Sequence, residues 1–218
     1  MLAQDSKSCK GDCTEATAAA GAGGVENATA GAGNAGGVEP TPKDESSTPS
    51  TIRLAGIVRE SIVDGPGLRF AVFCQGCPHG CPGCHNPDTH DFDGGYDCDI
   101  DKIVAAVDEN PLLDGITLSG GEPMCQPEAF CVLCQKIKER GLNVVTFTGY
   151  TYEELLELEK SRPAIAELLD LTDYLVDGRF EMDKRDLTLM FRGSQNQRVI
   201  DMAATRDAGE MVIAEQYM

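Results

Sequence analysis

The chain has 218 residues, with 36 acidic side chains against 18 basic ones and a formal net charge of −18. This acidity argues against wholesale binding of nucleic-acid phosphates, and no apolar run approaches the roughly 20 residues that a membrane span needs. The first residues lack the pattern of a secretory signal, so we expect a cytoplasmic protein. In that compartment, ten cysteines favour metal binding or catalysis over a disulfide framework.

Residues 1–50 differ in composition from the rest of the chain, because they are mostly Ala, Gly, Ser, Thr and Pro. Such a segment cannot bury enough apolar surface to offset the entropy cost of ordering, so we expect a disordered extension. Cys9 and Cys13 within it are expected to be free thiols. We expect the functional domain over residues 51–205 and a C-terminal tail over residues 206–218.

From residue 51 onward, short apolar runs alternate with helical patterns. Strands are predicted at residues 69–74, 115–118, 143–147 and 174–176, with further candidates at 187–191 and 198–200. Helices are predicted at residues 103–107 and 128–140, the second closed by Gly141, and a third opens at Thr151 with a capping-box Glu154. The alternation predicts a parallel α/β sheet. About four to six units are too few for a closed barrel, so we expect a partial, open β/α barrel first and a flat doubly wound sheet second.

Two loops stand out because each follows a predicted strand. One is a cysteine-rich loop after residues 69–74, and the other contains Gly120 and Gly121 after residues 115–118. Ligands of α/β sheets and barrels bind at the carboxyl ends of the strands. The two loops are therefore expected to share one site.

The cysteine-rich loop reads FCQGCPHGCPGCHNP over residues 73–87 and carries Cys74, Cys77, Cys81 and Cys84. A zinc site with all four is the alternative interpretation, but zinc ribbons usually separate their two pairs by roughly 15–20 residues. Cys74 also ends the strand, where we expect its side chain in the core. The other three thiolates can cap three corners of a [4Fe–4S] cluster and leave one iron open.

The spacing Cys77-x3-Cys81-x2-Cys84, followed by GGEP at residues 120–123, resembles the radical S-adenosylmethionine (SAM) superfamily. The resemblance implies a [4Fe–4S] cluster on these three cysteines, whose open iron binds the amino and carboxylate groups of SAM. Reductive cleavage of SAM would then give methionine and a 5′-deoxyadenosyl radical. It also implies that GGEP contacts the methionyl amino group; Glu122 can support the ammonium or fix the loop.

One departure from the superfamily pattern lies just before the third cysteine, where many members have an aromatic residue and this chain has Gly83. Contact with adenine is then expected from the backbone of residues 83–85 or from elsewhere, and His85 either contributes or braces the loop through Asn86. The resemblance thus implies six cofactor-binding residues: Gly83, Cys84, His85, Gly120, Gly121 and Glu122. No catalytic side chain is expected, since the cluster and SAM carry the chemistry.

Longer blocks narrow the resemblance to the glycyl-radical-enzyme activases. These blocks are DGPGLR at residues 64–69, TGYTYEEL from 148, LVDGRF from 175 and FRGSQNQRVID from 191. Together with the cysteine loop they resemble the activating proteins of anaerobic ribonucleoside-triphosphate reductase. This implies hydrogen abstraction from a glycine of the reductase large subunit, with a flavodoxin- or ferredoxin-type electron donor. An activase of another enzyme, such as pyruvate formate-lyase, is the first alternative, and a non-catalytic zinc-stabilised adaptor is the second.

Several further residues have two interpretations. Cys98, Cys125, Cys131 and Cys134 either form a second metal site or are buried apolar residues, and we favour burial. Five others either line the site or make structural contacts: Tyr150, Tyr152, Arg192, Asn196 and Arg198. Asp64 and Arg69 either position the partner's glycine loop or fix the entry to the first predicted strand.

Overall fold

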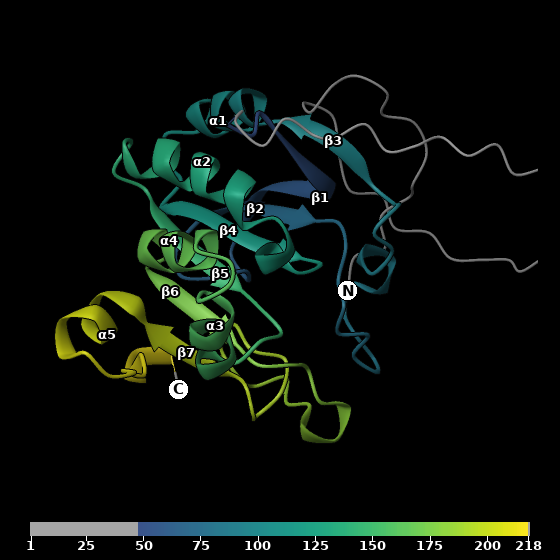
Figure 1. Ribbon diagram of the computed structural model, residues 1–218, viewed down its shortest axis with the longest axis vertical. Helices are drawn as coiled ribbons and strands as arrows, with labels where there is room; N and C mark the ends of the chain where they lie inside the picture. The colour runs from purple at the N-terminus through teal and green to yellow at the C-terminus, as the bar shows by residue number, and fades with distance from the viewer. Residues whose placement is uncertain (1–47, 218) are drawn as a thin grey trace, which may run out of the picture.

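The structure is a computed structural model that describes residues 48–217. The expectations for residues 1–47, including Cys9 and Cys13, lie outside the described residues. Five helices and a seven-stranded sheet form one α/β arrangement (Figure 1).

The sheet has the strand order β3-β1-β2-β4-β5-β6-β7. Its four central strands run parallel: β2 (Arg69–Cys74), β4 (Gly115–Gly120), β5 (Asn143–Phe147) and β6 (Tyr174–Asp177). Three antiparallel strands flank them: β1 (Thr51–Ser61), β3 (Tyr96–Asp99) and β7 (Arg198–Asp201). The predicted parallel α/β sheet is confirmed for the centre, whereas the curvature of a partial barrel stays a prediction.

The strand predicted at residues 187–191 is wrong. Asp186 bonds both the amide and the hydroxyl of Thr188, and its own amide bonds back to the carbonyl of Gly193. These contacts turn the segment into a loop, and Leu187 is 78% exposed. An apolar run without a neighbouring strand or a core to cover it gains nothing from extending.

The helices are α1 (Ile100–Asp108), α2 (Pro127–Lys138), α3 (Tyr152–Leu158), α4 (Ala164–Leu171) and α5 (Met202–Ala208). Short 3-10 turns occupy Pro87–Thr89, Pro123–Cys125, Met182–Lys184 and Glu215–Tyr217. The predicted capping box of Thr151 and Glu154 opens α3, and Gly141 follows α2 with φ +71°. Within residues 48–217, no helix has the length and apolarity for a bilayer span.

One face of the sheet carries the main core. Figure 1 shows α1, α2 and α4 side by side on that face, where alternate strand residues such as Val72, Leu118 and Leu175 are fully buried against them. Burying such side chains contributes roughly 1.5–3 kcal/mol each. This layer anchors the strands whose carboxyl ends carry the candidate site.

The other face is covered by loops and by the end of the chain. The carbonyl of Asp64 accepts a hydrogen bond from Thr117 Oγ1, so the loop of residues 62–68 lies over β4. Ala214 is buried in a small cluster with valines of β5, β6 and β7. The described part of the expected tail therefore packs on the sheet, and the expected boundary at residue 205 falls inside α5.

Candidate metal and cofactor site

The cysteine loop leaves the carboxyl end of β2. Cys74 is the last residue of that strand, is 0% exposed, and packs in the helix-side core. Burial raises the pKa of its thiol well above the usual value. The predicted place of Cys74 in the core is confirmed, and Cys77, Cys81 and Cys84 are half-buried free thiols on the loop beyond it.

The loop is closed by its own backbone. The amides of Gly76 and Cys77 donate to the carbonyls of Thr89 and His90 at 2.8 and 3.2 Å. Gly76 has φ +94°, a conformation that other residues rarely adopt. The amide of Asn86 points at Cys84 Sγ at 3.4 Å. Three thiols are thus carried on one tight, self-bonded loop.

The thiols influence one another electrostatically. Burial raises the pKa of both Cys77 and Cys84. The negative charge of a neighbouring Cys81 thiolate raises both pKa values further, while a backbone hydrogen bond to each thiol lowers them. Thiolates in this loop therefore need a positively charged partner, and soft thiolates suit iron–sulfur clusters. Among residues 48–217, no three His, Cys, Asp or Glu side chains converge on a single ion. A cubane does not require this, because each cysteine binds a different iron.

The GGEP loop lies directly against the cysteine loop. The amide of Gly121 donates to the carbonyl of Cys74 at 2.9 Å, and the amide of Glu122 donates to the carbonyl of Gly76 at 2.8 Å. A Cβ atom on Gly121 would lie 2.4 Å from the Gly76 carbonyl oxygen. Only glycine permits this approach, and the predicted pairing of the two loops at one edge of the sheet is confirmed.

Glu122 is 0% exposed and its carboxylate accepts several hydrogen bonds. Oε1 accepts from the Met124 amide at 3.0 Å and from Thr148 Oγ1 at 2.9 Å. Oε2 accepts from the Gly149 amide at 2.9 Å and lies 2.7 Å from His79 Nε2. Of its two expected roles, the structure shows the fixing of loops; support of the SAM ammonium stays a prediction.

His79 is the site residue that sequence reasoning missed. Its side chain is 4% exposed, and beyond Glu122 it lies edge-on to Tyr150, with ring centroids 4.5 Å apart. Its Nδ1 lies 3.3 Å from Arg179 Nε. One signal was available: it is the one titratable side chain between Cys77 and Cys81.

An aromatic ring reaches Gly83 from another loop. Phe180, after β6, lies against His85 with ring centroids 4.9 Å apart, and a Cβ on Gly83 would meet its ring at 3.5 Å. A hollow of about 450 Å³ adjoins this contact and is lined by Pro82, Phe180, Glu181, Met182 and Asp183. Met182 of the same loop lies nearer, since a Cβ on Gly83 would be 2.0 Å from its Cε atom, so the β6 loop covers Gly83 with both a thioether and an aromatic ring.

Of the remaining candidate residues, some lie beside the site and others only make structural contacts. Arg198 binds Asp177 and Glu153. Arg192 donates to the carbonyls of Gln197 and Tyr217. Both arginines thus make structural contacts.

Tyr150 touches the site through His79, whereas Tyr152 packs against the main core at the start of α3. Asn196 Nδ2 donates to the Arg179 carbonyl at 2.8 Å, which places this amide beside the site.

The other cysteines do not gather into a second metal site within the described residues. Cys98, Cys131 and Cys134 are 0–3% exposed in the main core. Burial raises the pKa of Cys131 to about 12, so its thiol stays protonated. Cys125, on the turn after GGEP, is half-buried.

Arg69 lies at the opposite, amino end of β2 and is also 0% exposed. It donates to Thr117 Oγ1 and to backbone carbonyls of Pro66, Ile116 and Asn143. Burial lowers the pKa of its guanidinium to about 10. These contacts fix the entry to β2, and a role toward a partner's glycine stays a prediction.

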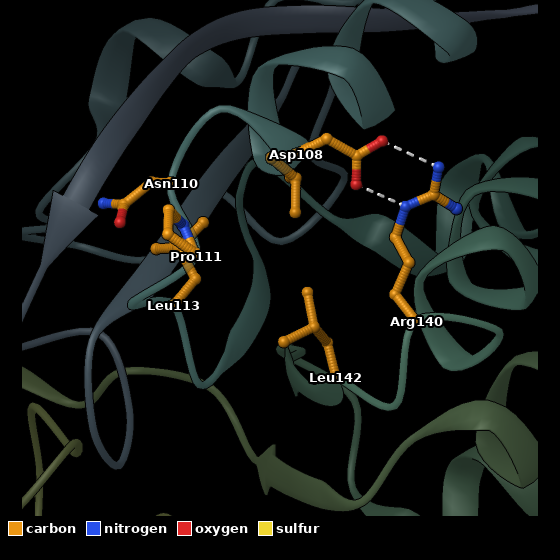
Figure 2. Close-up of a pocket in the computed structure, with 7 residues that line it drawn as sticks. Asp108, Asn110, Pro111, Leu113, Arg140 and Leu142 are labelled. Carbon is orange, nitrogen blue, oxygen red and sulfur yellow. Dashed lines mark hydrogen bonds and ion pairs between the residues drawn. The ribbon is translucent and has the colours of Figure 1, made fainter.

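A second hollow, of about 200 Å³, lies at this amino edge and contains none of the predicted site residues. Figure 2 shows Leu113 and Leu142 beside it and the double hydrogen bond of Arg140 to Asp108 at its rim. The chemistry-bearing residues gather at the other end of the strands.

Comparison with known proteins also points to an iron–sulfur site at the carboxyl ends of the strands. A family model described as "4Fe-4S single cluster domain" matches residues 63–200. The chain belongs to this family of iron–sulfur proteins. The match includes the whole cysteine loop and the GGEP loop, so an iron–sulfur cluster is supported.

Several curated proteins are similar in sequence. The anaerobic ribonucleoside-triphosphate reductase-activating protein of Salmonella typhimurium is 37% identical over 146 residues, which are 63% of this chain and 91% of that protein. The protein of the same name from Escherichia coli K12 is 36% identical over the same shares. The pyruvate formate-lyase-activating enzyme of Clostridium pasteurianum is 36% identical over 58% of this chain and 55% of its own length. The chain is thus a radical SAM enzyme of the activating type, as its motifs predict.

Proposed function

We propose that the chain is a cytoplasmic activating enzyme that reductively cleaves SAM and generates a glycyl radical on an anaerobic ribonucleoside-triphosphate reductase. One observation carries the proposal. Three free thiols lie on a loop that is hydrogen-bonded to GGEP, while the fourth cysteine of the motif is fully buried at the end of β2. Cys77, Cys81 and Cys84 are the proposed ligands of a [4Fe–4S] cluster that keeps one iron open.

When bound, the cluster would supply one electron to the sulfonium of SAM, taken from a flavodoxin- or ferredoxin-type donor. The chain's own residues would bind SAM and orient it. The backbone of Gly120 and Gly121 is close enough to the cysteine loop to meet the methionyl end of SAM. Gly83, His85 and the Phe180 ring beside them offer a surface for adenine.

The reductase as partner is supported by the names and coverage of the relatives. Those named for this reductase share about nine-tenths of their length with this chain, whereas the pyruvate formate-lyase relative shares about half. The second enzyme is therefore the alternative target. Each activase type needs a protein glycine as hydrogen donor, so the two targets can be compared in one assay.

The test starts with protein reconstituted with iron and sulfide under anaerobic conditions. We expect about four irons per chain, an EPR signal of the reduced cluster that changes when SAM is added, and release of 5′-deoxyadenosine. Replacing Cys77, Cys81 or Cys84 by Ala should abolish this release. Cys74→Ala is the matched control and should retain it; equal loss in all four variants would refute the three-cysteine site.

The target is tested by mixing the loaded enzyme, a reductant and SAM with either glycyl radical enzyme. A glycyl-radical EPR signal on the reductase but not on the lyase supports the proposal. A signal on the lyase alone would assign the alternative target.

A further inference from the structure

His79 joins the cysteine loop to three other loops. Its Nε2 lies 2.7 Å from Glu122 on the loop after β4, and its Nδ1 lies 3.3 Å from Arg179 after β6. The same Glu122 carboxylate accepts from the Gly149 amide on the loop after β5. The carboxyl ends of all four parallel strands therefore meet at one His–Glu pair. Figure 1 places the loops after β2 and β6 on the same side of the molecule.

The hydrogen bonds determine which ring nitrogen of His79 donates and which accepts. Arg179 Nε can only donate, so His79 Nδ1 accepts from it, and Nε2 carries the proton donated to Glu122. The ring also has a tightly defined place, because a Cβ on Gly149 would lie 2.3 Å from its Cδ2 atom. Both the ring's position and its tautomer are thus set by its neighbours.

The same residue lies midway along the chain between two proposed ligands. His79 follows the proposed ligand Cys77 by two positions and precedes the proposed ligand Cys81 by two. A side chain held at Glu122 therefore limits how the backbone between two ligands can turn. Without it, Glu122 would lose a strong, charge-assisted hydrogen bond inside the protein.

We propose that His79 is a positioning residue: through its hydrogen bond to Glu122, it holds the loop between Cys77 and Cys81 in the conformation that accepts the cluster. The part of this proposal that concerns the cluster rests on the proposed function. The part that concerns the order of the loop does not, because it applies to the metal-free chain as well.

The first experiment uses the full metal-free chain and measures the rate at which iodoacetamide alkylates Cys77, Cys81 and Cys84, by peptide mass spectrometry. His79→Leu removes the donor to Glu122, and we expect alkylation to be about tenfold faster, the effect of losing one hydrogen bond to a charged group. His79→Gln can still donate through its own Nε2 and should stay within about threefold of the wild type.

His90→Leu is the matched control. His90 lies in the same loop, and its Nε2 is buried without a hydrogen-bond partner in the structure. Its replacement loses no Nε2 hydrogen bond and should leave the alkylation rates unchanged. Urea unfolding of each variant, followed by circular dichroism, verifies that the compared proteins are folded.

The second experiment measures iron release from the reconstituted enzyme to a ferrous chelator. Groups that orient metal ligands change metal affinity by about 10–100-fold when removed, so His79→Leu should release iron at least about tenfold faster. His79→Gln should restore most of the retention. The SAM-induced change in the EPR spectrum should weaken in the Leu variant and return in the Gln variant.

The possible outcomes distinguish a failure of the His79 proposal from a failure of the proposed function. If folded His79→Leu protein is alkylated and releases iron at wild-type rates, the proposal is overturned. It is also overturned if the Gln variant behaves like the Leu variant, because the hydrogen bond is then not the cause. If wild-type protein takes up no iron, the proposed function fails, while the alkylation rates still decide the role of His79.

Discussion

Arg69 and Glu122 are fully buried charged side chains at opposite ends of the central strands, and the two are used differently. At the amino edge, Arg69 donates hydrogen bonds to oxygens of the loop before β2 and of strands β4 and β5. At the carboxyl edge, Glu122 accepts from groups on two other loops and from an amide of its own loop. Both side chains are 0% exposed. The cation therefore secures the strands, whereas the anion secures the parts that surround the proposed cluster.

This contrast separates stability from cofactor binding. A buried ionic group is costly unless hydrogen bonds satisfy it, so each end depends on its partners. Changes at the amino edge should reduce the free energy of unfolding and leave iron retention alone. Changes at the carboxyl edge should reduce iron retention more than they reduce stability.

The largest effect is expected for Arg69→Met. It leaves several buried carbonyl oxygens without donors, and we expect the free energy of unfolding to fall by about 3–5 kcal/mol. Arg140→Met is the control, because that arginine pairs with Asp108 at the surface and should cost less than about 1 kcal/mol. Urea denaturation measures both. Equal losses in the two variants would contradict the role given to the buried cation.

Glu122→Gln tests the other end of the comparison. One acceptor oxygen becomes an amide donor that faces the donors of His79 and Gly149, so the loops should separate. We expect iron affinity to fall by about 10–100-fold and unfolding free energy to fall by about 1–3 kcal/mol. Chelator competition and urea denaturation give the two values. Glu128→Gln, which alters a half-exposed pair with Arg162, should change neither appreciably.

A pair of glycine substitutions sharpens the contrast. In Gly149→Ala the new methyl meets the His79 ring at 2.3 Å, whereas in Gly115→Ala it meets the Asn143 carbonyl oxygen at 2.0 Å. We expect the first to raise the iron-release rate by several-fold, about 3–10, and the second to cost about 1–3 kcal/mol of stability. If Gly115→Ala accelerated iron release as much as Gly149→Ala, the two edges would not act separately.

The smallest effect concerns acid stability at the carboxyl edge. The hydrogen bond from Arg198 lowers the pKa of Glu153 to about 2, below its unfolded value of about 4.3. Its contribution is therefore present above about pH 4.3 and is lost as the pH falls through about 2. Because Glu153 is largely exposed, the gain should stay below about 1 kcal/mol.

Glu153→Gln should remove this part of the pH dependence in urea titrations between pH 2 and pH 6. Glu157→Gln, on the same helix and paired with Lys160 at the surface, is the control. An unchanged acid dependence in Glu153→Gln would show that the pair adds nothing to folding.

The sequence predicted the centre of the fold well, because β2, β4 and β5 are short apolar runs bounded by turns. It did not reveal β1, although Ile52 and Leu54 are fully buried and alternate with less buried neighbours. The antiparallel partners of β1 are set by tertiary contacts. The capping box of α3 was visible because both of its residues are local.

The site was predictable where spacing carries the signal. The cysteine loop and GGEP are short motifs, and their meeting follows from the rule for strand ends. The His79–Glu122 contact was not predictable, because its partners lie 43 residues apart. Likewise, nothing local indicates that Met182 and Phe180 lie against Gly83, since a separate loop supplies both side chains.

The distance along the chain between His79 and Arg179 also determines when their contact can form during biosynthesis. Arg179, which completes the contacts of His79, lies 100 residues after it. At about 5–20 residues per second, a ribosome needs about 5–20 s to make that interval. During this time the three thiols exist on a nascent chain whose loop lacks its last partner. The contacts that order the proposed cluster site are therefore complete only after Arg179 has been made.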